Sequence, residues 1–288
     1  MITVDDLPSL RAHDGGPVCV LAESADGDLA AEAARELGLE VIDRGRPTRH
    51  PRIAVTGQHL DAVLFTWAQD RRLTPIRLVA GSAGLLVVAE RSVLEWLGRQ
   101  VRDDEGDVSS AFVAALLCVA HHGEDTLAEL VDATQDLEGR AGGYTSAPER
   151  REMSRLRIHL FEVSELATAQ RRLLSSDEEL AEHLGPQYRR MLRRAEGAFE
   201  QNRSMAAGLY AMLGDLMNQQ ATVVSERLTL VATVFMPLTL ATGFFGMNFG
   251  WMTERIGALP TFITLGVMLP VVLSVLTLAL VRRLTLSV

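Results

Sequence analysis

An amide side chain lies between two long uncharged segments near the C-terminal end of the sequence. It is Asn248, in the stretch Phe245-Gly246-Met247-Asn248-Phe249, and the uncharged segments span 228–245 and 256–281. A neutral amide oxygen accepts hydrogen bonds. It can therefore hold a small divalent cation through the water around the ion, and such ions give up that water reluctantly. An asparagine after a helix is also a common C-terminal cap, so the residue type alone leaves open a cap and a binding position for a hydrated cation.

The two uncharged segments are long enough to position this amide at a membrane surface. They contain about 18 and about 26 residues, and helices of that length cross a hydrocarbon core of about 30 Å. The link between them is too short to be a domain. Two crossings, a tight hairpin and a polar amide at the start of the hairpin indicate an ion-conducting membrane protein.

The first hundred residues alternate short apolar runs with turn residues, which is typical of an α/β domain. Residues 29–37 predict a helix between the first two strands. The predicted strands are 17–21, 39–42, 53–55, 62–65 and 84–88. We therefore expect a cytosolic α/β domain over residues 1–105, in a chain of the α+β class.

Helical spacing of apolar residues follows this domain. It predicts helices over 109–137 and 148–174, separated by a break at 139–147. The sequence Ser176-Asp177-Glu178-Glu179 is a capping signature for a short third helix that ends near Gly185.

The spacing then continues without a break into the first uncharged segment. Apolar or small residues recur in steps of four and three after Pro186, interrupted by Asn202. They predict a single helix from Gln187 to Gly243, about 85 Å long at 1.5 Å per residue. A helix of that length needs neighbours, and heptad-like spacing indicates other copies of the same chain.

Composition excludes several classes of protein. The net charge of −9 argues against a nucleic-acid partner, because no basic face would neutralise phosphates. All 28 basic residues are arginine. Cys19 and Cys118 lie in apolar contexts and are expected to be buried, reduced thiols. We find no nucleophile–base pair, nucleotide loop or cleavable signal, and we expect neither an enzyme nor an organic cofactor.

Arginines flank the uncharged segments unevenly. The hairpin holds only Arg255, beside Glu254, while the other flanks carry Arg203, Arg227, Arg282 and Arg283. The positive-inside bias then predicts that both termini are cytoplasmic and that the hairpin is external.

The segment 228–249 resembles the pore helix of the CorA family of divalent-cation transporters. The family's marks are Pro-Leu-Thr in the first membrane span and Gly-Met-Asn at its outer end, and here they are Pro237-Leu238-Thr239 and Gly246-Met247-Asn248. The resemblance covers about 186–283 and extends back to about 109. In the first hundred residues only the α/β layout matches.

This resemblance implies a homopentameric funnel in the plasma membrane, with the lipid bilayer and divalent cations as further partners. Family members conduct Mg²⁺, some also Co²⁺ or Ni²⁺, and Mg²⁺ can be both the transported ion and a regulatory ligand. The implied divisions are a helical stalk over 106–227, a first membrane helix over 228–249, an external loop over 250–257, a second membrane helix over 258–281 and a cytosolic tail over 282–288.

The resemblance also assigns the selectivity filter to Gly246, Met247 and Asn248, with the Asn248 amides meeting around the pentamer axis. Helical steps of three and four back from Gly243 give one uncharged face that mixes hydroxyl and apolar side chains. We expect this face to line the pore, and it consists of Thr222, Ser225, Leu228, Ala232, Met236, Thr239 and Gly243. The alternative is an ordinary packing face between helices.

Several positions depart from the family pattern. Phe245 stands where the family usually has Tyr, and the loop reads Met252-Thr253-Glu254 in place of Met-Pro-Glu. Glu254 can still attract cations, although Arg255 offsets its charge. Arg282 and Arg283 alone form the basic collar expected at the inner mouth of the pore.

The residues that would sense Mg²⁺ are not identified, because the start of the long helix is basic where the family carries a sensor acid. The acidic runs 103–107 and 177–179 are candidates, but solvated carboxylates and a helix cap explain them as well. A metal site at His121-His122 with Glu124 and Asp125 is disfavoured, because adjacent histidines on a regular helix cannot face one ion.

Three functions remain open from the sequence. The first is passive influx of Mg²⁺ through a CorA-type channel, which needs no ATP. The second is a ZntB-like Zn²⁺ transporter, which Gly250 and Thr242-Gly243 favour and Met247 disfavours. The third is a membrane-tethered scaffold or sensor that does not conduct.

Overall fold

The computed structural model describes residues 2–11, 16–25, 27–39, 50–68, 72–102, 107–140, 146–175, 178–246, 260 and 262–285. The chain divides into two compact units. The first contains the described residues up to Gly214, apart from Ser146, and the second contains those from Asp215 onward.

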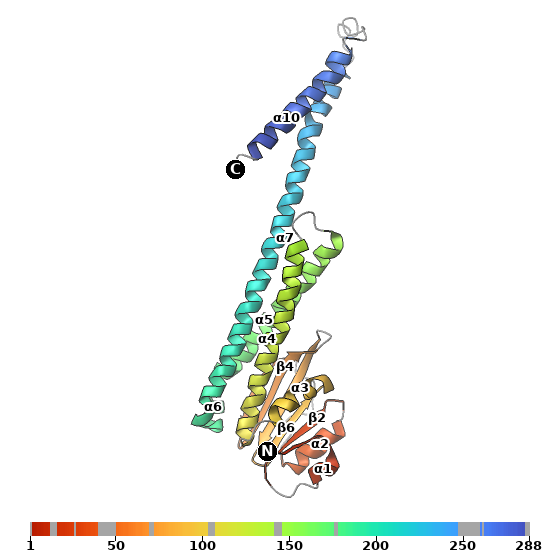
Figure 1. The fold of residues 1–288 in the computed structure, drawn as a ribbon. Helices are drawn as coiled ribbons and strands as arrows, with labels where there is room; N and C mark the ends of the chain where they lie inside the picture. The colour runs from red at the N-terminus through yellow and green to blue at the C-terminus, as the bar shows by residue number, and fades with distance from the viewer. Residues whose placement is uncertain are drawn as a thin grey trace. The chain divides into compact units, whose positions relative to one another are not determined.

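The first unit is built on a six-stranded mixed sheet in the order β1-β2-β6-β5-β4-β3 (Figure 1). β1, β2 and β6 are parallel, and β6, β5, β4 and β3 are antiparallel neighbours. The strands are β1 (Ile2–Val4), β2 (Val18–Glu23), β3 (Arg52–Thr56), β4 (His59–Trp67), β5 (Leu73–Gly81) and β6 (Gly84–Ala89).

The predicted α/β domain is confirmed, and four of its five predicted strands correspond to β2, β3, β4 and β6. The prediction at 39–42 is wrong at Leu39, which is not in a strand, and its other residues lie outside the described part. The sequence analysis did not predict β1 or β5. Gly84 shows how closely β2 and β6 approach, because a Cβ there would lie 2.1 Å from the Val18 carbonyl oxygen.

Helices cover both faces of the sheet. Helices α1 (Leu7–Arg11) and α2 (Gly27–Glu36) pack on one face, over a core that includes Val20, Val79 and Leu86. Helix α3 (Arg91–Arg102) and the start of α4 (Val108–Arg140) pack on the other face.

A buried charge lies among the antiparallel strands. The Asp61 carboxylate, 1% exposed, accepts hydrogen bonds from Arg77 at 2.9 and 3.1 Å and from Arg52 at 3.1 Å. Because Arg52 is on β3, Asp61 on β4 and Arg77 on β5, this carboxylate joins three strands through side chains in addition to their backbone ladder.

Three long helices continue the first unit: α4, α5 (Ala147–Ser175) and the first part of α7 (Arg189–Phe245). Before α7 come the short α6 (Glu178–Leu184) and the 3-10 turn η1 (Pro186–Tyr188). The helices predicted at 109–137 and 148–174 and the single helix predicted from 187 to 243 are confirmed, and α4 runs to Arg140, further than expected.

Polar side chains tie these helices to the sheet and to each other. Gln170 of α5, 3% exposed, accepts a hydrogen bond at 2.8 Å from the Phe65 backbone N–H of β4. Phe65 lies beyond the last β3–β4 pair, so the helix supplies the acceptor that the neighbouring strand does not. Arg171 of α5 pairs with Glu200 of α7, with 3.1 Å between Nε and Oε2.

The second unit contains the remainder of α7, the π-helix η2 (Phe262–Met268) and α10 (Leu269–Thr285). Pro237 lies inside α7 and Pro270 at the start of α10. A proline has no N–H and its ring crowds the carbonyl four residues earlier. The widened turns of η2 end just before Pro270 and include Gly266, whose carbonyl that ring would otherwise crowd.

Candidate functional site

The apolar part of α7 is the candidate site. Within the residues that the structure describes, the helix 186–244 alone is both long and apolar enough to cross a membrane, and its most apolar window is not buried at all. The second predicted span falls on η2 and α10, where the apolar helix found, Gly266–Ala279, is shorter.

A buried hydroxyl of α10 shows which side of α7 packs against α10. Ser274 of α10, 8% exposed, lies with its Oγ 3.5 Å from the Val234 carbonyl oxygen of α7, and it donates to its own helix at Pro270 O, 2.9 Å away. On α7, Val234, Pro237 and Leu238 are partly buried.

The seven residues predicted to line a pore lie on another side of α7, and all seven are exposed. Gly243 and Ser225 are each nine residues from Val234, which is two and a half turns at about 3.6 residues per turn. They therefore point away from the α10 side. Met236 and Leu228 are 74% and 65% exposed. Packing among the residues that the structure describes thus leaves the whole face uncovered.

The threonine hydroxyls on this face donate their protons to the helix itself. Thr222 and Thr239 on the face, and Thr229 beside it, donate to the carbonyl oxygens four residues earlier, at 3.1, 2.8 and 2.9 Å. A hydroxyl that donates its proton in this way still has lone pairs. Its oxygen therefore presents an acceptor to whatever lies beside the helix.

At the end of α7, Gly246 donates its N–H to the Thr242 carbonyl oxygen at 2.9 Å, which continues the helical pattern one residue past Phe245. Met247, Asn248 and Glu254 lie outside the described residues. Arg282 and Arg283 fall within α10, and Arg283 is exposed.

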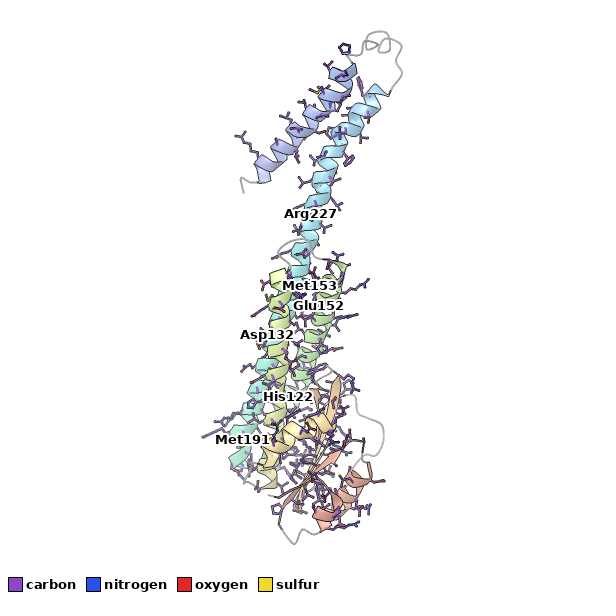
Figure 2. All side chains as sticks on the ribbon, turned by 45° about the vertical axis from the view of Figure 1, so that its right-hand side comes forward. His122, Asp132, Glu152, Met153, Met191 and Arg227 are labelled. Carbon is purple, nitrogen blue, oxygen red and sulfur yellow. The ribbon has the colours of Figure 1, made fainter. Side chains whose placement is uncertain are left out.

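One of the two histidines considered as a metal site, His122, makes structural contacts. His122, labelled in Figure 2, stacks on Trp96 with 4.3 Å between ring centroids. Its Nε2 lies 3.3 Å from the Trp67 carbonyl oxygen. In the described ranges, no three His, Cys, Asp or Glu side chains are grouped so that they could hold a metal ion.

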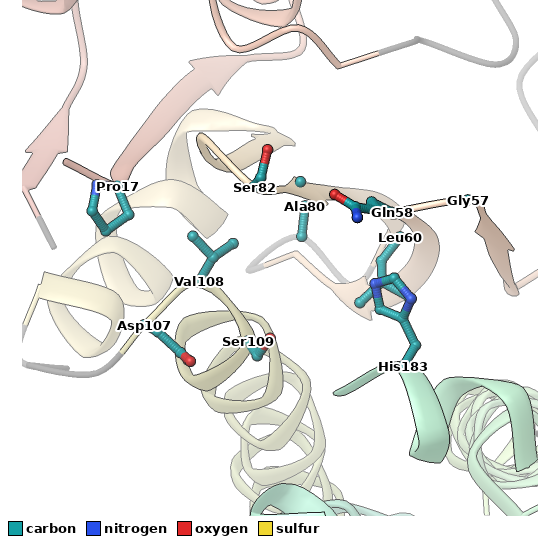
Figure 3. A pocket seen from close by; sticks show the side chains of 11 residues that line it. Pro17, Gly57, Gln58, Leu60, Ala80, Ser82, Asp107, Val108, Ser109 and His183 are labelled. Atoms are coloured by element: carbon teal, nitrogen blue, oxygen red, sulfur yellow. The ribbon is translucent and has the colours of Figure 1, made fainter. Parts of the chain in front are cut away.

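Of the acidic run 103–107, only Asp107 is described. It lines an open cavity of about 510 Å³ beside the turns of the sheet, with Gln58 and His183 (Figure 3). Its Oδ1 accepts hydrogen bonds from the Ser110 N–H at 2.9 Å and from the Tyr188 hydroxyl at 2.5 Å. Asp107 thus caps α4 and joins it to the turn that precedes α7.

Neither Cys19 nor Cys118 is in a disulfide bond, and Cys19 is buried as expected. Cys118 on α4 is partly buried. Burial raises the pKa of its thiol to about 11, with a smaller contribution from the Asp125 carboxylate. It therefore remains a neutral thiol at physiological pH.

Comparison with known proteins extends the resemblance found in the sequence. A protein-family model described as CorA-like Mg²⁺ transporter protein matches residues 58–283. The match reaches back into the sheet, well beyond the segment that the motifs alone identified. A putative metal ion transporter of Bacillus subtilis, YfjQ, is 35% identical over 77 residues, which is 27% of this chain and 24% of that protein.

Solved structures share the fold at low identity. The complete CorA magnesium transporter of Methanocaldococcus jannaschii has a TM-score of 0.68 and 16% identity, covering 92% of this chain and 90% of that one. The full-length CmaX protein has a TM-score of 0.62 and 14% identity, covering 93% and 88%. The ZntB cytoplasmic domain of Vibrio parahaemolyticus has a TM-score of 0.56 and 9% identity, covering 72% and 88%. At such identities the likeness is one of fold.

Proposed function

Because the chain belongs to the CorA-like Mg²⁺ transporter family, whose members are membrane transporters of metal ions, we propose that it mediates passive influx of hydrated Mg²⁺. The membrane potential drives this influx. A divalent cation that enters at about −100 mV gains about 4.6 kcal/mol, twice the 2.3 kcal/mol of a single charge.

The observation that carries the proposal is the uncovered face of α7 from Thr222 to Gly243. Water bound to a cation points its hydrogens outward, so a hydrated cation needs acceptors along its path. The Thr222, Thr229 and Thr239 oxygens offer acceptors because their protons are committed to the helix. Leu228 and Met236 form the apolar constrictions of this path, and the path is closed to ions when water leaves these constrictions.

The remaining assignments rest on the family pattern. We propose five copies around a common axis in the plasma membrane, with both termini cytoplasmic and the Gly246-Met247-Asn248 filter at the outer end. Five Asn248 amides would hold the ion through its water. Glu254 would attract cations outside, and Arg282 and Arg283 would form the collar at the inner mouth.

The test is ion flux into liposomes that contain the purified protein, at an imposed negative internal potential. We expect a Mg²⁺-sensitive dye to report uptake that stops when the potential is abolished. Uptake reported by a Zn²⁺ dye alone would favour Zn²⁺ transport, and Co²⁺ and Ni²⁺ are tested as competitors. If no dye reported uptake of any of these ions, the protein would not be a conducting channel.

The filter is tested by Asn248→Ala. We expect flux to fall sharply while the oligomer, measured by native mass spectrometry, stays intact. Asn218→Ala, an exposed amide before the apolar part of α7, is the control for loss of an amide as such. Unchanged flux in Asn248→Ala would remove Asn248 from the filter.

A further inference from the structure

One polar residue lies within the apolar side that α7 presents to its neighbours in the first unit. Asn202 is 3% exposed, and the other buried residues on this part of the helix are apolar. Its Nδ2 donates a hydrogen bond at 2.8 Å to the Ala120 carbonyl oxygen of α4, 82 residues earlier in the chain.

Gly123 makes room for this amide. A Cβ at position 123 would lie 2.5 Å from Asn202 Nδ2, closer than any real contact. The other glycine of α4, Gly139, is more than four turns further on and has no such neighbour. A shift of α7 by one turn would bring the amide against a side chain of α4, so the two helices fit in one register.

A second contact fixes the same register. The Tyr188 hydroxyl, just before α7, donates to Asp107, just before α4. From there to the Asn202–Ala120 contact the chain advances by about the same length on each helix, 14 residues on one and 13 on the other. Helices α4 and α7 therefore run parallel, with matched contacts at two levels.

The chemistry of Asn202 points to specificity more than to stability. Its Oδ1 is buried with no hydrogen-bond partner among the described residues. A leucine would fill similar space without an unpaired acceptor, and buried polar groups of this kind are best known for fixing the register of packed helices.

We propose that Asn202 and Gly123 form a register lock that fixes the axial position of α7 on α4, and that ion transport depends on it. The link to transport rests on the proposed function. It follows from the continuity of α7, which runs unbroken from Arg189 to Phe245 and so contains both Asn202 and the uncovered face. Asn202 is a positioning residue and does not contact the ion.

The register is measured directly, by the distance between spin labels at Asp136 of α4 and Ser204 of α7, both exposed. Asp136 is 16 residues beyond Ala120 and Ser204 is 2 residues beyond Asn202, so the labels are offset by 14 residues, about 21 Å along the axis, and an axial shift changes their distance directly. The full-length protein carries Cys19→Ala and Cys118→Ala, and labelled chains are diluted with unlabelled ones. We expect one narrow distance in this background. Asn202→Leu should add a population displaced by about one turn, about 5.4 Å along the axis.

Gly123→Ala is the second variant, because its methyl group displaces the Asn202 amide without removing it. Gly139→Ala is the matched control on the same helix. We expect Gly123→Ala to broaden the distance and to lower Mg²⁺ flux several-fold, as Asn202→Leu does, and Gly139→Ala to do neither.

A single narrow distance in both Asn202→Leu and Gly123→Ala would overturn the lock, as would an equal effect of Gly139→Ala. Altered distances with wild-type flux would overturn its role in transport. If the parent protein transports no ion, the distances still decide whether the lock exists.

Discussion

At the scale of single residues, Asp61 is the side chain whose loss should most clearly lower the stability of the fold. It is almost fully buried, and both of its oxygens accept hydrogen bonds from guanidinium groups. Asp61→Ala would remove the carboxylate that accepts hydrogen bonds from both Arg52 and Arg77. Both arginines keep some contact with solvent, which moderates the cost, and we expect unfolding to become easier by about 2–3 kcal/mol.

Chemical denaturation of the full-length protein in detergent measures this change. Glu95→Ala is the control, because its pair with Arg91 is 80% and 70% exposed and should contribute less than about 1 kcal/mol. Equal effects of the two substitutions would contradict a special role for Asp61.

Cys118 gives a prediction about reactivity. Burial raises the pKa of its thiol to about 11, so little thiolate exists near neutral pH. We expect iodoacetamide to alkylate native Cys118 slowly at pH 8 and faster as the pH rises toward 11. In urea the thiol should react at the rate of an ordinary cysteine, with a pKa of about 8.5. Mass spectrometry follows the labelling, and rapid modification of the native protein at pH 8 would contradict the prediction.

At the scale of elements, β5 explains why part of the sheet escaped prediction. Pro75 and Arg77 interrupt its apolar pattern, and a proline argues against an inner strand. In the structure Pro75 pairs with Phe65 on the β4 side, but it lies beyond the last β5–β6 pair, at Arg77 and Val88. β5 therefore has a neighbour on both sides from Arg77 to Ala80, but at Pro75 it has a neighbour only on the β4 side. The sequence of β5 alone cannot predict this, because the neighbouring strands come from other parts of the chain.

The helices were easier to predict, because their apolar spacing is local. Spacing alone predicted α4, α5 and the continuous α7, while the face from Thr222 to Gly243 was obtained by helical steps back from the motif. It marked Asn202 only as an interruption, since the partner Ala120 and the space at Gly123 belong to another helix. The hydrogen bonds from the threonine hydroxyls to the helix backbone could likewise not be predicted from a sequence pattern, because they depend on side-chain rotamers.

The stability contributed by the contact between α5 and α7 should depend on pH. Arg203, which donates a hydrogen bond to Glu200, and Arg171 lower the pKa of the Glu200 carboxyl below its usual 4.5. A carboxyl with a lowered folded-state pKa adds stability above its unfolded pKa and loses it as the pH falls through the folded value. We expect Glu200→Gln to be less stable than the parent at pH 7, with the difference shrinking as the pH falls below about 4.5 and vanishing once the pH is below the lowered folded-state pKa.

Thermal unfolding of both proteins between pH 7 and pH 3 tests this dependence. Glu129→Gln, an exposed carboxylate of α4 for which no arginine pairing is observed in the described residues, is the control. A difference between the parent and Glu200→Gln that stays constant over the whole range would contradict the prediction.

At the scale of the whole molecule, the central expectation is assembly. The uncovered face of α7 carries hydroxyl and apolar side chains and no charge, and no described part of the chain lies against it. We expect native mass spectrometry of protein extracted in mild detergent to give five copies. A monomer at every detergent concentration would remove the shared pore.

The choice of method follows from composition. Lysine is absent from the sequence, and all 28 basic residues are arginine. Amine-directed cross-linkers would therefore find no side chain to attack, and a negative result with them would carry no information. Carboxylate-directed reagents have 37 acidic residues available and provide the independent check.

The parallel course of α4 and α7 has an electrostatic consequence. Every helix carries a partial positive charge at its first turn, and here two such turns begin at the same end of the first unit. Helix α5 runs the opposite way, because Arg171 meets Glu200 while Arg157 meets Tyr210, so it opposes only one of the two dipoles. The partial positive charge that α5 does not offset lies at the end of the first unit where Asp107 accepts hydrogen bonds from the Ser110 N–H and the Tyr188 hydroxyl. One carboxylate thus caps α4 and holds the turn that precedes α7, and an uncharged amide there would remove the negative charge that opposes the dipole of α4 and would weaken the contact with Tyr188.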